Sequence, residues 1–156
     1  MAKQSAGLLM YRILTRGPEV LLVHPGGPFF AAKDDGAWTI PKGEIELNED
    51  PLVCAKRELT EETGIVATAG SFLALGSIKQ AGGKLVHAWA FKGDWDGVLR
   101  SNTFELEWPP RSGRTKMFPE VDRAAFFSIA QARTKLNAAQ VVLLDRLLAA
   151  LSAQLG

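Results

Sequence analysis

Three glutamates, Glu58, Glu61 and Glu62, are spaced to share one face of a helix, because residues three and four apart lie side by side there. Like charges packed so closely repel one another and destabilise the helix unless a cation neutralises them. Hard oxygen ligands suit Mg²⁺, Ca²⁺ or Mn²⁺, whereas a site without histidine or cysteine ligands suits zinc poorly. The spacing therefore predicts a divalent-metal site.

The residues around these acids predict the helix that would position them. Asp50 is a suitable N-cap, Pro51 fits the first helical position, and Gly64 can take the left-handed conformation that ends a helix. An apolar stripe at helical spacing runs beside the acids and would pack on a sheet; it consists of Leu52, Ala55 and Leu59. Residues 38–44 predict a short strand leading into a loop, where Gly43 would let a backbone carbonyl approach the same metal.

The stretch 43–65 resembles the Nudix box, G-x5-E-x7-R-E-U-x-E-E-x-G-U, in which U is a bulky apolar residue. An ordinary solvated helix with salt-bridging charges is the alternative, but it explains neither the clustered acids nor the flanking glycines. Every fixed position of the box is filled, by Gly43, Glu49, Arg57, Glu58, Leu59, Glu61, Glu62, Gly64 and Ile65.

The resemblance implies an α/β fold, an α/β/α sandwich with a mixed β-sheet. It implies a hydrolase in which water attacks phosphorus in a nucleoside diphosphate linked to another moiety. Glu58, Glu61 and Glu62 would hold Mg²⁺, or Mn²⁺ as a substitute, with the carbonyl of Gly43. Glu58 is the expected general base, and Arg57 would orient the acids by pairing with Glu49. The expected catalytic residues are thus Glu58, Arg57 and Glu61.

Family members often supply a further metal ligand from outside the box. Residues 103–108 alternate apolar and polar side chains, which predicts a strand with Glu105 and Glu107 on one face. We favour Glu107 as the ligand because it is nearest the following loop. The alternative is that both glutamates face solvent.

Length and composition predict one domain over residues 1–156, with 47% apolar and 22% charged residues. The net charge of +1 gives no support for a nucleic-acid or membrane partner. The single cysteine, Cys54, excludes an intramolecular disulfide and fits a reducing compartment. We find no run long enough for a membrane span and no signal peptide, so we expect a cytoplasmic protein.

Apolar runs and turn residues predict the other elements. Residues 5–14 and 19–24 would form a hairpin, and residues 70–80 and 84–92 a second one. Residues 120–128 would form a last strand, followed by helices at 129–135 and 137–155. The final helix is apolar over much of its circumference, which suggests a homodimer.

Several residues are candidates for binding a nucleotide substrate. Phe30 lies in a Gly- and Pro-rich loop and could stack on a base, or could instead plug the edge of the core. Lys42 beside the metal site would hold a long phosphate chain. Arg111 and Arg114 lie in a basic loop that suits polyphosphate, and ordinary solvated charges are the alternative. His24 and His87 are more typical of structural histidines.

The Pro41-Lys42-Gly43 sequence resembles the dinucleoside polyphosphate and diphosphoinositol polyphosphate branches of the family. Our order of substrates is dinucleoside polyphosphate, then nucleoside triphosphate or its oxidised form, then nucleotide sugar. Two further alternatives are a nucleotide-sensing domain without turnover and a hydrolase of capped RNA ends. The complete set of box carboxylates favours an enzyme over a sensor.

Overall fold

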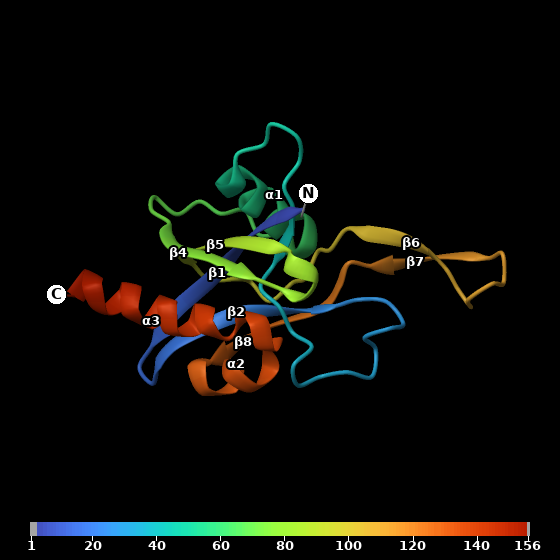
Figure 1. Ribbon diagram of the computed structural model, residues 1–156. Coiled ribbons are helices and arrows are strands. Elements are labelled where there is room, and N and C mark those ends of the chain that lie inside the picture. The colour runs from blue at the N-terminus through green and yellow to red at the C-terminus, as the bar shows by residue number, and fades with distance from the viewer. Residues whose placement is uncertain (1–2, 156) are drawn as a thin grey trace.

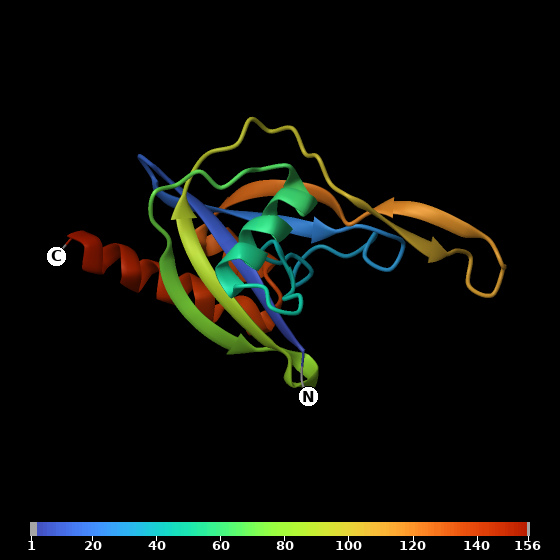
Figure 2. The ribbon, with the colours of Figure 1, turned by 90° about the horizontal axis from the view of Figure 1, so that it is seen from above.

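A mixed β-sheet forms the centre of the computed structural model, which describes residues 3–155. Its strands follow the order β4-β5-β1-β2-β8, and the short β3 also pairs with β1 (Figures 1 and 2). The β1–β5 pair is parallel, and the other pairs are antiparallel. The sheet strands are β1 (Gln4–Leu14), β2 (Gly17–Pro25), β3 (Lys42–Glu44), β4 (Leu73–Lys79), β5 (Leu85–Lys92) and β8 (Val121–Ser128).

Helices cover both faces of this sheet, so the expected α/β/α arrangement is confirmed. The helix α1 (Pro51–Thr63) lies on one face, and α2 (Ile129–Lys135) and α3 (Val142–Leu155) lie on the other (Figure 1). Side chains alternate between the two faces along each strand. In β1, Leu8 and Met10 join the core beneath α1, whereas Leu9 and Tyr11 join the core beneath α2 and α3.

The strand β3 brings the start of the box against the sheet. It pairs antiparallel with β1, with Lys42 opposite Gly7 and Gly43 opposite Ala6. A side chain at Gly7 would collide with the carbonyl oxygen of Pro41, because a Cβ there would lie 2.6 Å from it. The glycine in β1 therefore permits the close approach that sets Lys42 and Gly43 beside α1.

The expected hairpins are present, with a short 3-10 turn (Ala81–Gly83) joining β4 and β5. The final helical region is also broken near Asn137, where a second 3-10 turn (Ala138–Gln140) precedes α3. One strand was not predicted. Residues 115–119 form β7 (Thr115–Pro119) opposite β6 (Thr103–Glu107).

The β6–β7 hairpin is a separate two-stranded sheet that projects from the body of the protein (Figures 1 and 2). Its base is fixed by backbone hydrogen bonds of Asn102. The Asn102 N–H donates to the carbonyl oxygen of Glu61 (2.7 Å), and its carbonyl oxygen accepts from the Glu120 N–H (2.8 Å). Both ends of the hairpin are therefore tied to the end of α1.

The C-terminal helical stretch corrects the expectation that no run of the sequence is long enough to span a membrane. Residues Ala138–Leu155 are 18 residues long with a mean hydropathy of 1.4, which is enough by length and composition to cross a membrane. This is weak support for a membrane location, because core helices pass the same test. Leu143, Leu144 and Leu147 pack into the core beneath the sheet. The homodimer suggested by this helix stays a prediction.

Candidate active site

The helix α1 begins and ends as its sequence predicts. The Asp50 carboxylate accepts from the backbone N–H groups of Leu52 (3.0 Å) and Val53 (3.2 Å). Gly64 ends the helix with φ of 84°, a left-handed conformation that glycine adopts without strain. These caps fix the register of the helix, so its last two turns carry the acids toward β3.

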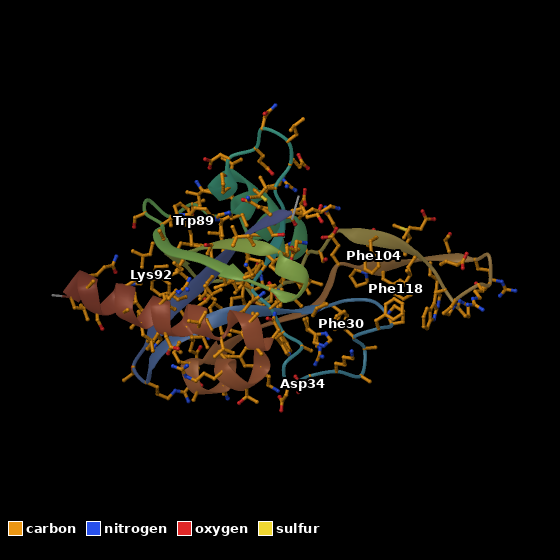
Figure 3. The ribbon with its side chains drawn as sticks, in the orientation of Figure 1. Phe30, Asp34, Trp89, Lys92, Phe104 and Phe118 are labelled. Carbon is orange, nitrogen blue, oxygen red and sulfur yellow. The ribbon has the colours of Figure 1, made fainter. Side chains whose placement is uncertain are left out.

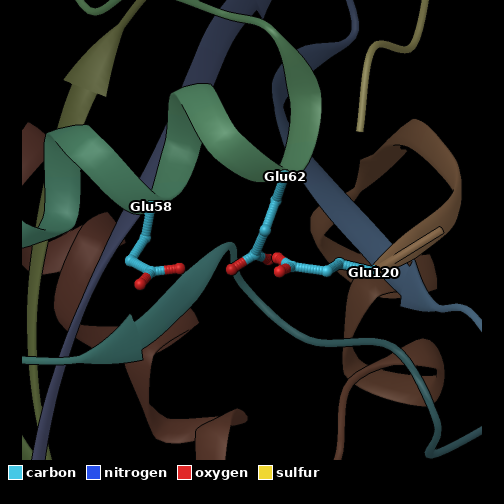
Figure 4. A group of neighbouring side chains, drawn as sticks. All are labelled: Glu58, Glu62 and Glu120. Atoms are coloured by element: carbon cyan, nitrogen blue, oxygen red, sulfur yellow. The ribbon is translucent and has the colours of Figure 1, made fainter. Parts of the chain in front are cut away.

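Three carboxylates meet at this end of α1. Glu58 and Glu62 come from the helix, and Glu120 comes from the residue between β7 and β8 (Figure 4). One oxygen from each lies within 4.8 Å of the others. Glu62 is only 7% exposed, which makes the centre of the cluster a poorly hydrated place for negative charge.

The electrostatics of the cluster reflect this crowding. Burial, the charge of Glu58 and a hydrogen bond with it raise the pKa of Glu62 to about 9. Burial and the charge of Glu61 raise the pKa of Glu58, and burial and Glu58 raise that of Glu120. Without a cation, the three groups therefore cannot all be ionised at neutral pH.

Gly43 lies directly against this cluster. A Cβ on Gly43 would lie 2.1 Å from the carboxyl carbon of Glu58, so any larger residue would displace that carboxylate. The carbonyl oxygen of Gly43 accepts a weak hydrogen bond from the Cys54 thiol on α1 (3.6 Å) and so faces the helix. Burial raises the pKa of Cys54 to about 12, in keeping with a packing residue and not a nucleophile.

Arg57 links the neighbouring acids. Its guanidinium forks onto Glu49 through Nε (2.8 Å) and Nη2 (2.9 Å). Its Nη1 also donates to Glu58 (3.0 Å) and Glu61 (3.1 Å). The hydrogen bonds from Arg57 lower the pKa of Glu49 to about 2. This arrangement matches the expected pairing of Arg57 with Glu49 and places Glu61 beside the cluster, bound to Arg57.

A cleft of about 520 Å³ is lined by Lys42 but by none of the three clustered carboxylates. Lys42 lines the cleft and also lies near the carboxylates, since its charge interacts with Glu58 and Glu62. Burial and the neighbouring Lys84 lower the Lys42 pKa, and the carboxylates oppose this shift. The cleft is lined by Pro25, Phe30, Gly36, Ala37, Thr39, Lys42, Gln80, Ala81, Asn137, Ala138 and Ala139.

Two residues of this region were not anticipated. Glu120 joins Glu58 and Glu62 from outside the box, where the sequence favours Glu107. The Asn137 side chain lines the cleft, and its buried Oδ1 has no hydrogen-bond partner within residues 3–155. Neither residue belongs to a local sequence pattern, because each reaches the site only through the folded sheet.

The structure places three of the expected site residues on the projecting hairpin, away from both the carboxylate cluster and the cleft. Glu107 lies on the projecting hairpin, where its carboxylate accepts from the Arg111 N–H (2.8 Å) instead of joining the cluster. Arg111 and Arg114 lie in the loop at the end of the same hairpin and do not line the cleft. The reason is the unpredicted strand β7, which carries residues 107–114 away from α1.

His24 has a structural role, as expected. It is fully buried, with Nδ1 against Asp122 (2.8 Å) and Nε2 against the Lys33 carbonyl oxygen (2.7 Å). These contacts hold the loop 26–37 on the sheet and set Phe30 at the cleft.

Helical layers on both faces of a mixed sheet, with clustered carboxylates at the end of one helix, define an α/β protein with a candidate cation site. The family model of the NUDIX domain matches residues 3–147, and the chain belongs to this family. The resemblance of the box is therefore confirmed at the level of the family.

Curated relatives match parts of the chain. The RNA pyrophosphohydrolase of Rhodospirillum rubrum is 38% identical over 63 residues, which are 38% of this chain and 36% of that protein. The CTP pyrophosphohydrolase of Escherichia coli K12 is 33% identical over 76 residues, which are 47% of this chain and 55% of that protein. These matches span less than two thirds of each relative's length.

Solved structures share the fold over the whole chain. A Caenorhabditis elegans Ap4A hydrolase in a binary complex has a TM-score of 0.70 and 22% identity, with 97% of this chain and 99% of that chain covered. The NUDIX domain of Shewanella oneidensis NrtR, complexed with ADP ribose, has a TM-score of 0.64 and 15% identity, with 100% and 90% covered. At these identities the likeness shows the fold alone.

Proposed function

We propose that this protein is a Mg²⁺-dependent hydrolase that cleaves a pyrophosphate bond in a nucleoside diphosphate linked to another moiety. The observation that carries the proposal is that Lys42 lines the cleft and also interacts through its charge with Glu58 and Glu62 of the carboxylate cluster. A phosphate chain that binds there would meet a cation site on one side and a nucleoside-sized pocket on the other.

The residues of the cluster fit a divalent cation. Three carboxylates and the nearby carbonyl of Gly43 are hard oxygen ligands, which Mg²⁺ and Mn²⁺ prefer. Burial and mutual repulsion raise the pKa values of Glu58, Glu62 and Glu120 although Arg57 and Lys42 lie nearby, and a bound cation would relieve that repulsion. When bound, the cation would neutralise phosphate oxygens and make the attacking water more acidic.

The protein's own residues supply positioning and proton transfer. Lys42 donates to the phosphate chain and holds it over the cluster. Glu58 accepts the proton of the attacking water at a carboxylate oxygen, and Arg57 keeps Glu58 and Glu61 in place through its bond to Glu49. The ring of Phe30, which lines the cleft, suits a nucleobase there.

Our first substrate class is a dinucleoside polyphosphate, followed by a nucleoside triphosphate. The partly buried Lys42 supports a chain of several phosphates, and the open cleft leaves room for one nucleoside. One structural neighbour is an Ap4A hydrolase, and the E. coli relative is a CTP pyrophosphohydrolase. These two names accord with the two substrate classes. A diphosphoinositol polyphosphate would use Lys42 but leave Phe30 without a base.

The experiment is a hydrolysis assay with Mg²⁺ across dinucleoside polyphosphates, nucleoside triphosphates and nucleotide sugars, with products separated by chromatography. Glu62→Gln is the test variant, and we expect it to lower turnover by about a hundredfold or more. Glu105→Gln, on the projecting hairpin, is the matched control and should turn over normally. Nucleotide binding without cleavage of any compound would instead identify a sensing domain and refute the enzymatic proposal.

A further inference from the structure

The β6–β7 hairpin, with residues 103–119, extends well beyond the body of the protein, and we call it the arm (Figures 1 and 2). It contributes nothing to either core cluster among the described residues. A projecting pair of strands gains little from burial, so its side chains are free to serve a ligand.

One face of the arm gathers aromatic rings and cations. The register pairs Phe104 with Phe118 and Leu106 with Lys116, and the Trp108 N–H bonds the Arg114 carbonyl oxygen (2.9 Å). Residues opposite each other in such a ladder share a face. The acidic residues of the arm lie on the other face, where Glu105 pairs with Met117 and Glu107 with Thr115.

Within the part of the chain that the structure describes, the cations of the arm have no acidic partner. Arg111, Arg114 and Lys116 make no ion pair with any residue in the range 3–155, and residues 108–116 contain no acid. Trp108, Pro109, Arg114, Thr115 and Lys116 surround a hollow of about 330 Å³. A flat ring beside two unpaired cations suits a ligand with a base and phosphates.

Aromatic residues continue from the arm to the cleft. Phe29, which is 62% exposed, meets Trp108 edge to face with ring centroids 5.7 Å apart. The next residue, Phe30, lines the cleft, and Figure 3 shows Phe30 below Phe104 and Phe118 of the arm. The base of the arm also leads directly to Glu120 of the acidic cluster.

We propose that the arm binds single-stranded nucleic acid whose phosphorylated terminal nucleotide occupies the cleft. Stacking on Trp108 and Phe29 requires bases that are not paired with another strand. Arg114 and Lys116 would bind the phosphates that link these bases. The net charge of +1 does not by itself support a nucleic-acid partner. This value sums all charges of the chain, including acids that lie outside the arm. The placement of the terminal nucleotide rests on the proposed function, whereas binding along the arm does not.

The test is fluorescence anisotropy with a 3′-labelled, 5′-triphosphorylated single-stranded RNA of about ten nucleotides, in EDTA so that nothing is cleaved. Arg114→Ala/Lys116→Ala should weaken binding by about tenfold or more and lower the slope of log affinity against log salt by about 1.4, for two lost phosphate contacts. Trp108→Leu should weaken binding by about tenfold with the slope unchanged.

The matched control is Arg16→Ala/Lys92→Ala, which removes two exposed cations at the opposite end of β1 and β5. It should bind RNA as the unmodified protein does. Equal losses in both double variants, or RNA binding no tighter than that of a nucleoside triphosphate, would overturn the proposal. The proposal would also be overturned if the protein does not bind RNA and instead forms a dimer that Trp108→Leu dissociates. The arm would then join two copies of the chain.

The arm variants also separate this inference from the proposed function. Arg114→Ala/Lys116→Ala should hydrolyse a free nucleoside triphosphate at the normal rate, because neither residue lines the cleft. RNA binding that depends on the arm, in a protein that hydrolyses no nucleotide, would refute the enzymatic proposal and leave the arm as a nucleic-acid surface. Nucleotide hydrolysis without RNA binding that depends on the arm would support the enzymatic proposal and refute the role of the arm.

Discussion

Gly43 and Glu58 approach so closely that a Cβ on the glycine would lie 2.1 Å from the carboxyl carbon of the glutamate. The lack of a side chain at Gly43 is thus a condition for the position of Glu58. We expect Gly43→Ala to lower turnover by about a hundredfold, because a displacement of about 1 Å at a reacting group has that effect. Steady-state kinetics at saturating Mg²⁺ would measure it.

Gly70 provides the control for this substitution. It is exposed, and a Cβ added there would meet no atom within 4 Å. Gly70→Ala should leave turnover unchanged. If both alanine variants were fully active, the close contact between β3 and α1 would have no part in catalysis.

Glu120 and Glu107 give opposite predictions for Mg²⁺. Glu120 lies in the carboxylate cluster, whereas Glu107 binds the Arg111 backbone on the arm. Glu120→Gln should therefore weaken Mg²⁺ affinity by at least about tenfold, and Glu107→Gln should not change it. Isothermal titration calorimetry with MgCl₂ would measure both variants. A larger effect at Glu107 would restore it as the ligand expected from sequence.

Lys42 tests the choice of substrate. Loss of its ammonium group removes a charge-assisted hydrogen bond, so Lys42→Ala should lower kcat/KM by about tenfold or more on a substrate with four phosphates. The effect on a nucleoside diphosphate sugar should be smaller, since fewer phosphates reach Lys42. Lys92→Ala is the control, because Lys92 is exposed at the end of β5 and does not line the cleft. Equal losses on both substrates would contradict a polyphosphate preference.

Arg57 should be irreplaceable by lysine despite the equal charge. Its planar fork bonds Glu49 through two nitrogens and reaches Glu58 and Glu61 with a third. We expect Arg57→Lys to lower kcat by about tenfold to a hundredfold, as for residues that orient metal ligands. Circular dichroism should show an intact fold. A variant as active as the unmodified protein would assign Arg57 a purely electrostatic role.

The bond to Arg57 also predicts how stability depends on pH. Because the Glu49 pKa falls from 4.5 to about 2 in the folded protein, its contribution to stability is complete above pH 4.5. That contribution is lost as the pH falls through about 2, where the folded protein also takes up the proton. The difference in unfolding free energy between the unmodified protein and Glu49→Gln should therefore shrink between pH 5 and pH 2.

Urea unfolding at several pH values would measure this difference. Glu105→Gln, an exposed substitution on the arm, is the control and should show no comparable narrowing. A difference between the Glu49 variants that stays constant down to pH 2 would mean that the Arg57 fork does not stabilise the fold.

Local patterns were enough to predict the helix of the box. The cap at Asp50, the stop at Gly64 and the apolar stripe ending in Leu59 all act within a few residues, so they can be recognised without a fold. The same holds for the strands β1 and β2, whose apolar runs are interrupted by a short turn.

The residues that complete the site could not be predicted in this way. Glu120 reaches α1 because β8 pairs with β2 and because Asn102 anchors its backbone. The fully buried Gln140 bonds the Ile40 N–H (2.9 Å) across the sheet, which no local pattern reveals. The strand β7 is five residues long and carries a charge, so its pairing with β6 decides its structure more than its own propensity.

The anchoring of the arm by Asn102 bears on how this chain can diverge. Its bonds to Glu61 and Glu120 use only backbone atoms, which every amino acid except proline can supply in full. Sequence and length between residues 104 and 118 can therefore drift while the third carboxylate keeps its place. Selection could thus change what the arm recognises without altering the chemistry at its base.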